Sequence, residues 1–476
     1  MSERVQFATR VGAIAASVGS AVGLGNIWRF PCEAGEHGGG AFLLIYLACV
    51  LLMGIPVIVA EFVIGRGTHR NVSGALQQLA PGKKFHWLSW MWITASLMIL
   101  SFYSAVCGWI VEYLIQAASG HMSGLTLEQY HERFNAFVAN PWRCSLWTVL
   151  FLLINYYVLR HGVKRGIERV ANVMMPLLFI ILIILSVKAL TLDKAAEGIR
   201  FLFTPDFSKI TPRVVIGAMG QAFFSLSLGL SCLLTYASYF NNSNRLVRSA
   251  TIIAVLDTVV AVLAGIVIFP AVFTYGMTPQ EGPTLVFEVL PAIFQQMTGS
   301  YVWNLLFFIL LFFASLTSTI SMSEISITFF SEEYKMSRNG ATALNTGIAV
   351  VFGVLCALSF GVLNDLRIFG LTLFELFDFV SSNILLPAGG AGCSGRVPAK
   401  HLCGGSGLPL RCSCRTGRPF RCSRWPPGRS GPEKRCRNRP YGRPGAICPT
   451  TRRRGCREGR LRSIRSEFRG AVHRRC

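Results

Sequence analysis

Charged side chains are scarce in this sequence, and acidic ones are scarcer still. Only 14% of its 476 residues are charged, with 23 acidic against 46 basic side chains. A hydrophobic content of 52% and a mean hydropathy of +0.48 accompany this scarcity. Such a composition excludes an ordinary soluble enzyme and indicates a membrane protein.

The last 89 residues, 388–476, lack aspartate and contain only three acids, Glu433, Glu458 and Glu467. They carry 23 basic residues, so they supply +20 of the formal net charge of +23 and leave residues 1–387 near +3. Nine of the 15 cysteines also lie in this segment, and the other six are scattered. This distribution excludes a disulfide-stapled secreted domain and divides the chain into a body, 1–387, and a tail, 388–476.

Two kinds of motif are also absent. The sequence contains no GxxxxGK[ST] phosphate-binding loop, so ATP hydrolysis is not indicated. No group of residues suggests covalent catalysis. We therefore expect a protein that is not an enzyme.

Apolar runs long enough to cross a bilayer, about 20 residues each, recur along the body. They lie near residues 11–32, 41–65, 88–117, 145–160, 169–190, 213–238, 249–274, 301–330 and 342–363, and a tenth begins near 372. We do not expect the first run to be a cleavable signal peptide, because it is glycine-rich, exceeds a short apolar core and ends in Arg29. Nine such runs argue against a soluble helical bundle and predict an all-α polytopic membrane protein.

Basic residues collect before the first run and after every second run. These are Arg4, Arg10, Arg66, Arg70, Lys83, Lys84, Arg160, Lys164, Arg165, Arg169, Arg245, Arg248, Lys335 and Arg338. The intervening loops are acid-rich or mixed. Since short cytoplasmic loops are enriched in Lys and Arg, we expect a multi-pass protein of the cytoplasmic membrane with a cytoplasmic N-terminus.

The first and sixth runs are poorly suited to continuous helices. Residues 19–31 read GSAVGLGNIWRFP, and each glycine costs up to about 1 kcal/mol in a helix relative to alanine. A helix-packing face of small residues would explain the glycines but not Asn26 and Arg29, which are unfavourable at membrane depth. Residues 221–230, QAFFSLSLGL, have a similar irregularity five runs later. Interrupted helices at corresponding positions predict a five-plus-five inverted repeat with a transport site at the breaks.

At these residues the sequence resembles a known family. GSAVGLGNIWRFP with GGGAF, GQAFFSLSLG with TYASY, and FFASLTSTIS are similar to the first, sixth and eighth helices of neurotransmitter:sodium symporters. The resemblance covers roughly residues 4–387 and fits the bacterial amino-acid branch best. It implies sodium-coupled symport of a small hydrophobic or aromatic amino acid by alternating access, with the lipid bilayer and the amino acid as partners.

The resemblance implies two sodium sites, and sodium prefers oxygen ligands. The first matches Ala21, Asn26, Ser225 and Asp257, completed by the substrate carboxylate, so ion and substrate would favour each other's binding. The positions that match the second are Gly19, Val22, Ala314, Thr317 and Ser318. For Thr317 and Ser318, residue chemistry alone favours ordinary hydrogen bonding between membrane helices, and the family match favours the ion.

Asp257 departs from the family, whose members often have asparagine at this position. A buried intramembrane carboxylate is a functional candidate, and no lysine or arginine lies within its apolar run. Many animal relatives need chloride to offset two sodium charges. We expect Asp257 to supply that negative charge, so that chloride is not required.

The same segments supply the expected substrate site. N–H groups at Leu24 and Gly25 would bind a carboxylate at the end of a half-helix, together with the Tyr103 hydroxyl. Gly23 replaces the aspartate of monoamine transporters, which favours an amino acid over an amine. The expected substrate residues are Ala21, Gly23, Leu24, Gly25, Tyr103, Phe224, Ser225, Ser227, Leu230, Ser318, Thr319 and Met322.

Two gates follow from the resemblance. Arg29 and Asp378 match the outer pair, and Phe224 would close over the substrate. Arg4, Glu332 and Tyr239 match the inner gate, where relatives usually have aspartate in place of glutamate. The alternative for each charged pair is a solvated surface contact of little energy.

The tail shows no family motif. It contains 21 arginines and only two lysines, a mixture typical of GC-rich DNA translated in a wrong frame, and it is poor in aliphatic residues, so we expect disorder. Its arginines would bind any polyanion, although no specific nucleic acid is expected, and its cysteines lack convincing zinc spacing. If the last spans are missing, a transport-inactive remnant or a substrate-binding sensor is the alternative function. The oligomeric state stays open.

Overall fold

The computed structural model describes residues 6–79, 87–241, 244–276 and 285–389, all within Met1–Arg418, the first of the two units into which the chain divides. Within these residues every regular element is a helix. They are α1 (Arg10–Ala21), η1 (Gly25–Arg29), α2 (Phe30–Glu36), α3 (Gly40–Cys49), η2 (Val50–Gly54), α4 (Ile55–Thr68), α5 (Val72–Leu79), α6 (Trp87–Ala118), α7 (Leu127–Ala139), α8 (Pro141–Arg160), η4 (Val163–Glu168), α9 (Arg169–Ala189), α10 (Ala195–Phe203), η5 (Phe207–Lys209), α11 (Pro212–Ser225), α12 (Cys232–Ala237), α13 (Leu246–Thr274), η6 (Leu285–Val289), α14 (Leu290–Gln295), α15 (Ser300–Glu333), α16 (Arg338–Leu358), α17 (Leu373–Phe379) and η7 (Val380–Leu385).

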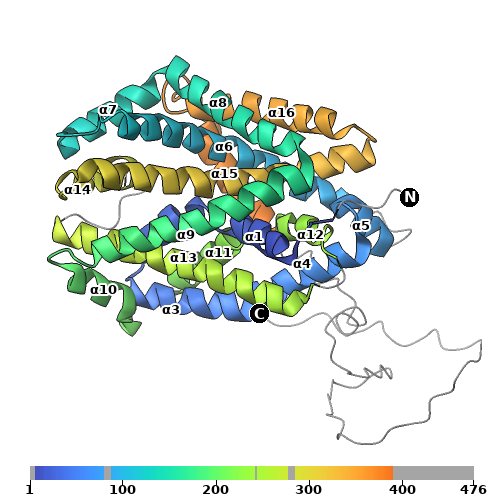
Figure 1. Ribbon diagram of the computed structural model, residues 1–476, viewed down its shortest axis with the longest axis horizontal. Coiled ribbons are helices and arrows are strands. Elements are labelled where there is room, and N and C mark those ends of the chain that lie inside the picture. Colours follow the sequence, from blue (N-terminus) through green and yellow to red (C-terminus); the bar gives the residue numbers. More distant parts are fainter. Residues whose placement is uncertain (1–5, 80–86, 242–243, 277–284, 390–476) are drawn as a thin grey trace, which may run out of the picture. The chain divides into compact units, whose positions relative to one another are not determined.

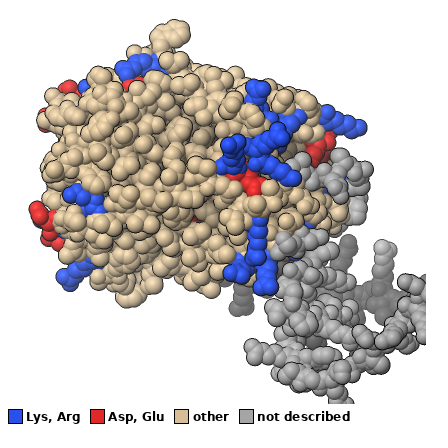
Figure 2. All heavy atoms as spheres, in the orientation of Figure 1, with Lys and Arg blue, Asp and Glu red and all other residues tan. Residues whose placement is uncertain are grey.

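The predicted all-α membrane fold is confirmed. Among the described residues, seven continuous helical segments are long and apolar enough to span a bilayer, and the bent pair Arg10–Ala21 and Gly25–Glu36 would make an eighth. The face drawn in Figure 2 carries its Lys, Arg, Asp and Glu side chains toward the two ends, with uncharged residues between them. That distribution suits a hydrocarbon band with charged ends.

Both expected interruptions occur in the chain. The helix axis bends by 49° between Ala21 and Gly25. The sixth span is divided into α11 and α12 by residues 226–231, where Ser227 and Ser231 adopt positive φ angles of 52° and 63°. Backbone groups freed by such breaks are tolerated at membrane depth only where protein or a water-filled cavity surrounds them.

Long helices enclose these breaks. The helices α6, α8, α15 and α16 pack against one another, and Figure 1 shows them running side by side. On the other side, α1 packs against α9, α13 and α15. The short helices α7, α10 and α14 gather at one end of this assembly and α5 lies at the opposite end (Figure 1). The two interruptions are thereby held in the interior of the helix assembly.

The tenth span is only partly described. It comprises α17 and η7 and continues in helical conformation to Gly389. Residues 390–476, which make up almost all of the tail, lie outside the described residues.

Candidate functional site

Three of the four expected first sodium residues, Asn26, Ser225 and Asp257, meet at one buried point, where Tyr46 of α3 joins them. The Asn26 amide Nδ2 donates to the Ser225 Oγ at 2.9 Å and to the Asp257 Oδ1 at 2.7 Å. Ser225 Oγ donates to the other carboxylate oxygen at 2.7 Å, and the Tyr46 hydroxyl lies 3.3 Å from that same oxygen. Asn26 follows the first break and Ser225 ends α11, so the two interruptions bring this cluster together.

The chemistry of this cluster fits a monovalent cation. The Asp257 side chain is fully buried, and all the side chains that bond it are neutral. Within the described part of the chain no Lys, Arg or His forms an ion pair with it. A buried carboxylate is costly without a positive partner, and its oxygens are the ligands that sodium prefers.

The second expected sodium residues also meet, where α1 crosses α15. The Ser318 Oγ donates to the Val22 carbonyl at 3.2 Å, and the Thr317 Oγ1 donates to the Ala314 carbonyl at 3.1 Å. A Cβ added at Gly19 would lie 3.2 Å from the Thr317 Cβ, so the two helices approach closely there. The carbonyl and hydroxyl oxygens suit sodium, although the same hydroxyls already bond backbone carbonyls.

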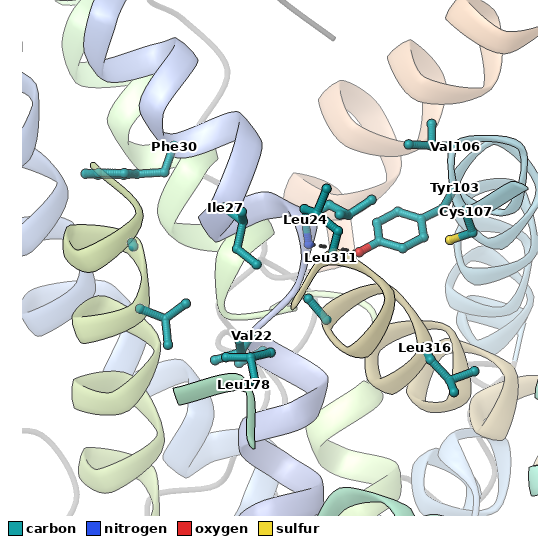
Figure 3. Packing of buried hydrophobic residues seen from close by; sticks show 14 of the residues in the cluster. Val22, Leu24, Ile27, Phe30, Tyr103, Val106, Cys107, Leu178, Leu311 and Leu316 are labelled. Carbon is teal, nitrogen blue, oxygen red and sulfur yellow. Dashed lines mark hydrogen bonds between the residues drawn. The ribbon is translucent and has the colours of Figure 1, made fainter. Parts of the chain in front are cut away.

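The substrate residues surround the first break. The Leu24 backbone N–H donates to the Tyr103 hydroxyl at 3.0 Å, a bond drawn between α6 and the interrupted first helix in Figure 3. A Cβ added at Gly23 would stand 2.5 Å from the Ser318 Oγ and 3.0 Å from the Tyr103 hydroxyl. A side chain at this position would therefore displace the Ser318 hydroxyl, whereas glycine lets both hydroxyls approach the break without rearrangement.

A small cavity of about 20 Å³ lies at the centre of these residues. Its lining includes nine expected residues: Ala21, Gly23, Gly25, Tyr103, Phe224, Ser227, Leu230, Ser318 and Met322. Three other expected residues lie elsewhere. Leu24 lines the neighbouring outer cavity, Ser225 bonds Asp257, and the Thr319 hydroxyl donates back to its own helix at Ser315 and Leu316.

Three lining residues were not anticipated from the sequence: Ser20, Ile99 and Leu386. Ser20 adjoins Ala21, and Ile99 lies one helical turn before Tyr103, so both could have been inferred from spacing. Leu386 follows η7 and reaches the cavity only through tertiary packing, so no local pattern indicated it.

The outer gate residues lie in one cavity but do not pair with each other. Arg29 and Asp378 both line a cavity of 310 Å³ next to the first helix break. The Arg29 Nε stands 3.7 Å from Glu33 Oε1, and its guanidinium lies 4.6 Å from the centre of the Phe224 ring. Asp378 instead accepts from the Ser382 hydroxyl at 2.8 Å. The structure therefore pairs Arg29 with the acid one helical turn away.

The inner gate is described only in part. Arg4 lies outside the described residues, and the Glu332 carboxylate accepts from the Asn71 backbone and side chain. Tyr239 donates to a different acid, Glu324, at 2.6 Å. Arg338 binds both oxygens of Glu324, at 2.8 and 2.7 Å. Glu324 was missed, although an acid inside the eighth apolar run was a visible signal.

A family model for the sodium:neurotransmitter symporter family matches residues 4–135 and 138–388. An uncharacterized sodium-dependent transporter of Bacillus subtilis, YhdH, is 41% identical over 402 residues, covering 84% of this chain and 89% of its own. One from Haemophilus influenzae is 37% identical over 403 residues, covering 82% of this chain and 88% of its own.

A solved structure shows the same fold. The crystal structure of MhsT in complex with L-phenylalanine is 42% identical to this chain. It superposes with a TM-score of 0.80, covering 85% of this chain and 93% of MhsT.

Proposed function

This chain belongs to the sodium:neurotransmitter symporter family, and from that premise we propose that it carries a small apolar amino acid together with sodium. The observation that carries the proposal is the buried carboxylate of Asp257, which no basic side chain of the described residues pairs, near the Tyr103–Leu24 contact. The neutral, mostly apolar cavity lining and the phenylalanine bound to MhsT favour a hydrophobic or aromatic amino acid.

The proposed mechanism is alternating access in the cytoplasmic membrane, with the N-terminus in the cytoplasm. The spans formed by the first, second, sixth and seventh runs would rock against the third, fourth, fifth and eighth. The first sodium would share the substrate carboxylate, so each would bind more tightly in the presence of the other. The second sodium would bridge α1 and α15 and stabilise one of their relative positions.

An uptake competition screen tests this function. The full chain in proteoliposomes is given labelled phenylalanine with each unlabelled amino acid in turn, with an inward sodium gradient or with potassium in its place. We expect sodium-dependent accumulation that apolar and aromatic amino acids suppress. Accumulation that is unchanged when potassium replaces sodium would contradict the proposal.

We also propose that Asp257 makes chloride unnecessary. The fixed carboxylate lies within hydrogen-bond reach of Ser225 and Tyr46, where it would offset one sodium charge. Replacing chloride with gluconate is expected to leave binding unchanged in the natural chain. In an Asp257→Asn variant, chloride is expected to restore part of the lost binding. A chloride requirement in the natural chain would refute this role.

The tail supports a second candidate, a binding sensor or inactive remnant of the same fold. We propose that residues 388–476 derive from a shifted reading frame, because their arginine-rich composition differs from the body and the family match ends at residue 388. Sodium-dependent amino-acid binding without gradient-driven uptake would select this candidate. Resequencing around codon 388 tests the frame: a downstream frame encoding apolar spans supports the shift, and an uninterrupted basic frame opposes it.

A further inference from the structure

Glu168 is a buried carboxylate that the proposed sodium and amino-acid sites do not use. It ends η4, directly before α9, and is only 4% exposed. The Ala8 N–H donates to its Oε2 at 2.8 Å, and the Thr9 N–H and hydroxyl donate to its Oε1 at 3.0 and 2.8 Å. One side chain therefore holds the residues that precede α1, although Ala8 lies 160 residues earlier in the chain.

The first turn of α1 fits closely around this carboxylate. The Thr9 hydroxyl caps the helix by accepting from the Gly12 N–H at 2.9 Å, while it donates its own proton to Glu168. A Cβ added at Gly12 would overlap Glu168 Oε1, so glycine allows the carboxylate to approach the helix. The positive end of the α1 dipole also favours a carboxylate here. The start of α1 and the end of η4 are thus matched in shape and in charge.

The partners of Glu168 are backbone N–H groups and one hydroxyl. Within the described part of the chain, no Lys, Arg or His forms an ion pair with it. If the start of α1 moved away, the carboxylate would lose all three of these hydrogen bonds together. An unsatisfied buried acceptor is unfavourable, so such a separation must expose Glu168 to water.

These bonds join two groups of spans that move relative to each other in the proposed mechanism. The first run, which contains α1, belongs to one group. The fifth run belongs to the other, and η4 continues into it without a break. Arg10 at the start of α1 and Arg169 at the start of α9 belong to the basic ends that we expect in the cytoplasm. Opening the transport site toward the cytoplasm would separate these two ends.

We infer that Glu168 is a positioning residue that holds the cytoplasmic end of α1 against η4 and so keeps the transport site closed to the cytoplasm. Loss of its bonds shifts the population toward conformations that are open on that side. The inference rests on the alternating access of the proposed function. It adds a contact that the expected inner-gate residues, Arg4, Glu332 and Tyr239, do not include.

The test measures how readily a buried position of α1 is reached from the cytoplasmic side. Ser17 is fully buried, and Ser17→Cys places a thiol of similar size there. The full chain with this change, in inside-out membrane vesicles without sodium or amino acid, is treated with a membrane-impermeant maleimide. Peptide mass spectrometry follows the labelling at position 17.

Glu168→Gln keeps the side-chain volume but removes the charge and one acceptor oxygen. The matched control is Glu375→Gln in α17, because the Glu375 carboxylate also accepts from a threonine N–H and hydroxyl, those of Thr372, but within one helical turn. We expect labelling to be about tenfold faster or more in Glu168→Gln and to change by less than about twofold in Glu375→Gln. Equal labelling rates in the two variants would overturn the inference.

Gly12→Ala disturbs the same contact from the other side. It retains Glu168 and favours the helix, but its methyl group would displace the carboxylate. A Cβ added at Gly347 of α16 meets no atom within 4 Å, so Gly347→Ala is the matched control. Faster labelling is expected in Gly12→Ala and not in Gly347→Ala. Labelling that stays at the natural rate in Gly12→Ala would count against a closing role for this contact.

Two further readings separate this role from a general loss of structure and from the proposed function. Cys356 of α16 is also fully buried, and its labelling is expected to stay unchanged in Glu168→Gln. Equal acceleration at Cys356 and at position 17 would show a merely structural role and overturn the inference. Sodium-dependent phenylalanine binding is measured on the same vesicles. Its absence from the natural chain would contradict the proposed function, whereas the labelling comparison tests Glu168 without either ligand.

Discussion

Two fully buried carboxylates in this molecule have opposite surroundings. Glu324 of α15 binds Arg338 through both oxygens and also accepts from Tyr239. Asp257 of α13 is bonded by Asn26, Ser225 and Tyr46, all of them neutral. The chain therefore pairs the first carboxylate with a cationic side chain, whereas among the described residues the second has no such partner. The difference distinguishes an acid that the chain pairs with its own arginine from the acid at the helix breaks that we propose as a sodium ligand.

The largest expected effect is the loss of the Asp257 carboxylate. In Asp257→Ala the first sodium loses its only charged protein ligand, so sodium-dependent amino-acid binding should fall below detection. Scintillation proximity with a labelled apolar amino acid measures it, with Gly347→Ala as the folding-neutral control. Binding that survives with its sodium dependence intact would remove the ion site from this position.

Glu324→Ala removes the other carboxylate and should lower the stability of the fold. It leaves the partly buried Arg338 without its counterion, which should cost no more than the roughly 3–5 kcal/mol of a fully buried pair. Thermal unfolding in detergent should show a lower midpoint, and the double variant Glu324→Leu with Arg338→Leu should recover most of it. Sodium affinity of the folded fraction should stay unchanged. A loss of sodium affinity in the folded Glu324→Ala protein would contradict the proposal that Asp257, and not Glu324, binds sodium.

Tyr103→Phe tests whether Tyr103 contributes to amino-acid binding and not to sodium binding. It removes the hydroxyl that accepts from the Leu24 N–H and that we expect to meet the substrate carboxylate. A hydrogen bond to a charged group contributes about 1.5–3 kcal/mol, so amino-acid affinity should fall by about tenfold or more. Sodium binding measured without amino acid should not change. An equal loss of both affinities would place Tyr103 in the ion site instead.

Tyr239→Phe gives the smallest expected effect. It removes one of three hydrogen bonds to Glu324 and leaves the Arg338 pair, which should cost about 1 kcal/mol of stability. The unfolding midpoint should therefore shift far less than in Glu324→Ala. A loss as large as that of the single Glu324 variant would mean that Tyr239, and not Arg338, stabilises the acid.

The helical breaks could be predicted because their causes are local. Glycine spacing and two polar residues in the first run, and hydroxyls followed by glycine in the sixth, disfavour a continuous helix wherever they occur. Asp257 could be singled out for a similar reason, since no base accompanies it within its run. Glu324 offered the same signal but was overlooked, and its partner Arg338 lies 14 residues away, beyond helical reach.

Features that depend on several helices could not be predicted in this way. Arg29 was expected to meet Asp378, but a partner at i+4 was already present in Glu33. Leu386 and a groove beside it arise only when the second, sixth and tenth spans pack together. The spacing of residues along one segment does not predict a groove that forms between three spans.

A sodium titration tests the proposed difference between Asp257 and Glu324 most directly. Binding of ²²Na⁺ to the full chain is measured in parallel for the natural protein, Asp257→Asn and Glu324→Gln, each of which keeps its side-chain volume. We expect half-saturation to rise by about tenfold or more in Asp257→Asn and by less than about twofold in Glu324→Gln. Equal shifts in the two variants, or no shift in Asp257→Asn, would contradict the proposal that the Asp257 carboxylate binds sodium.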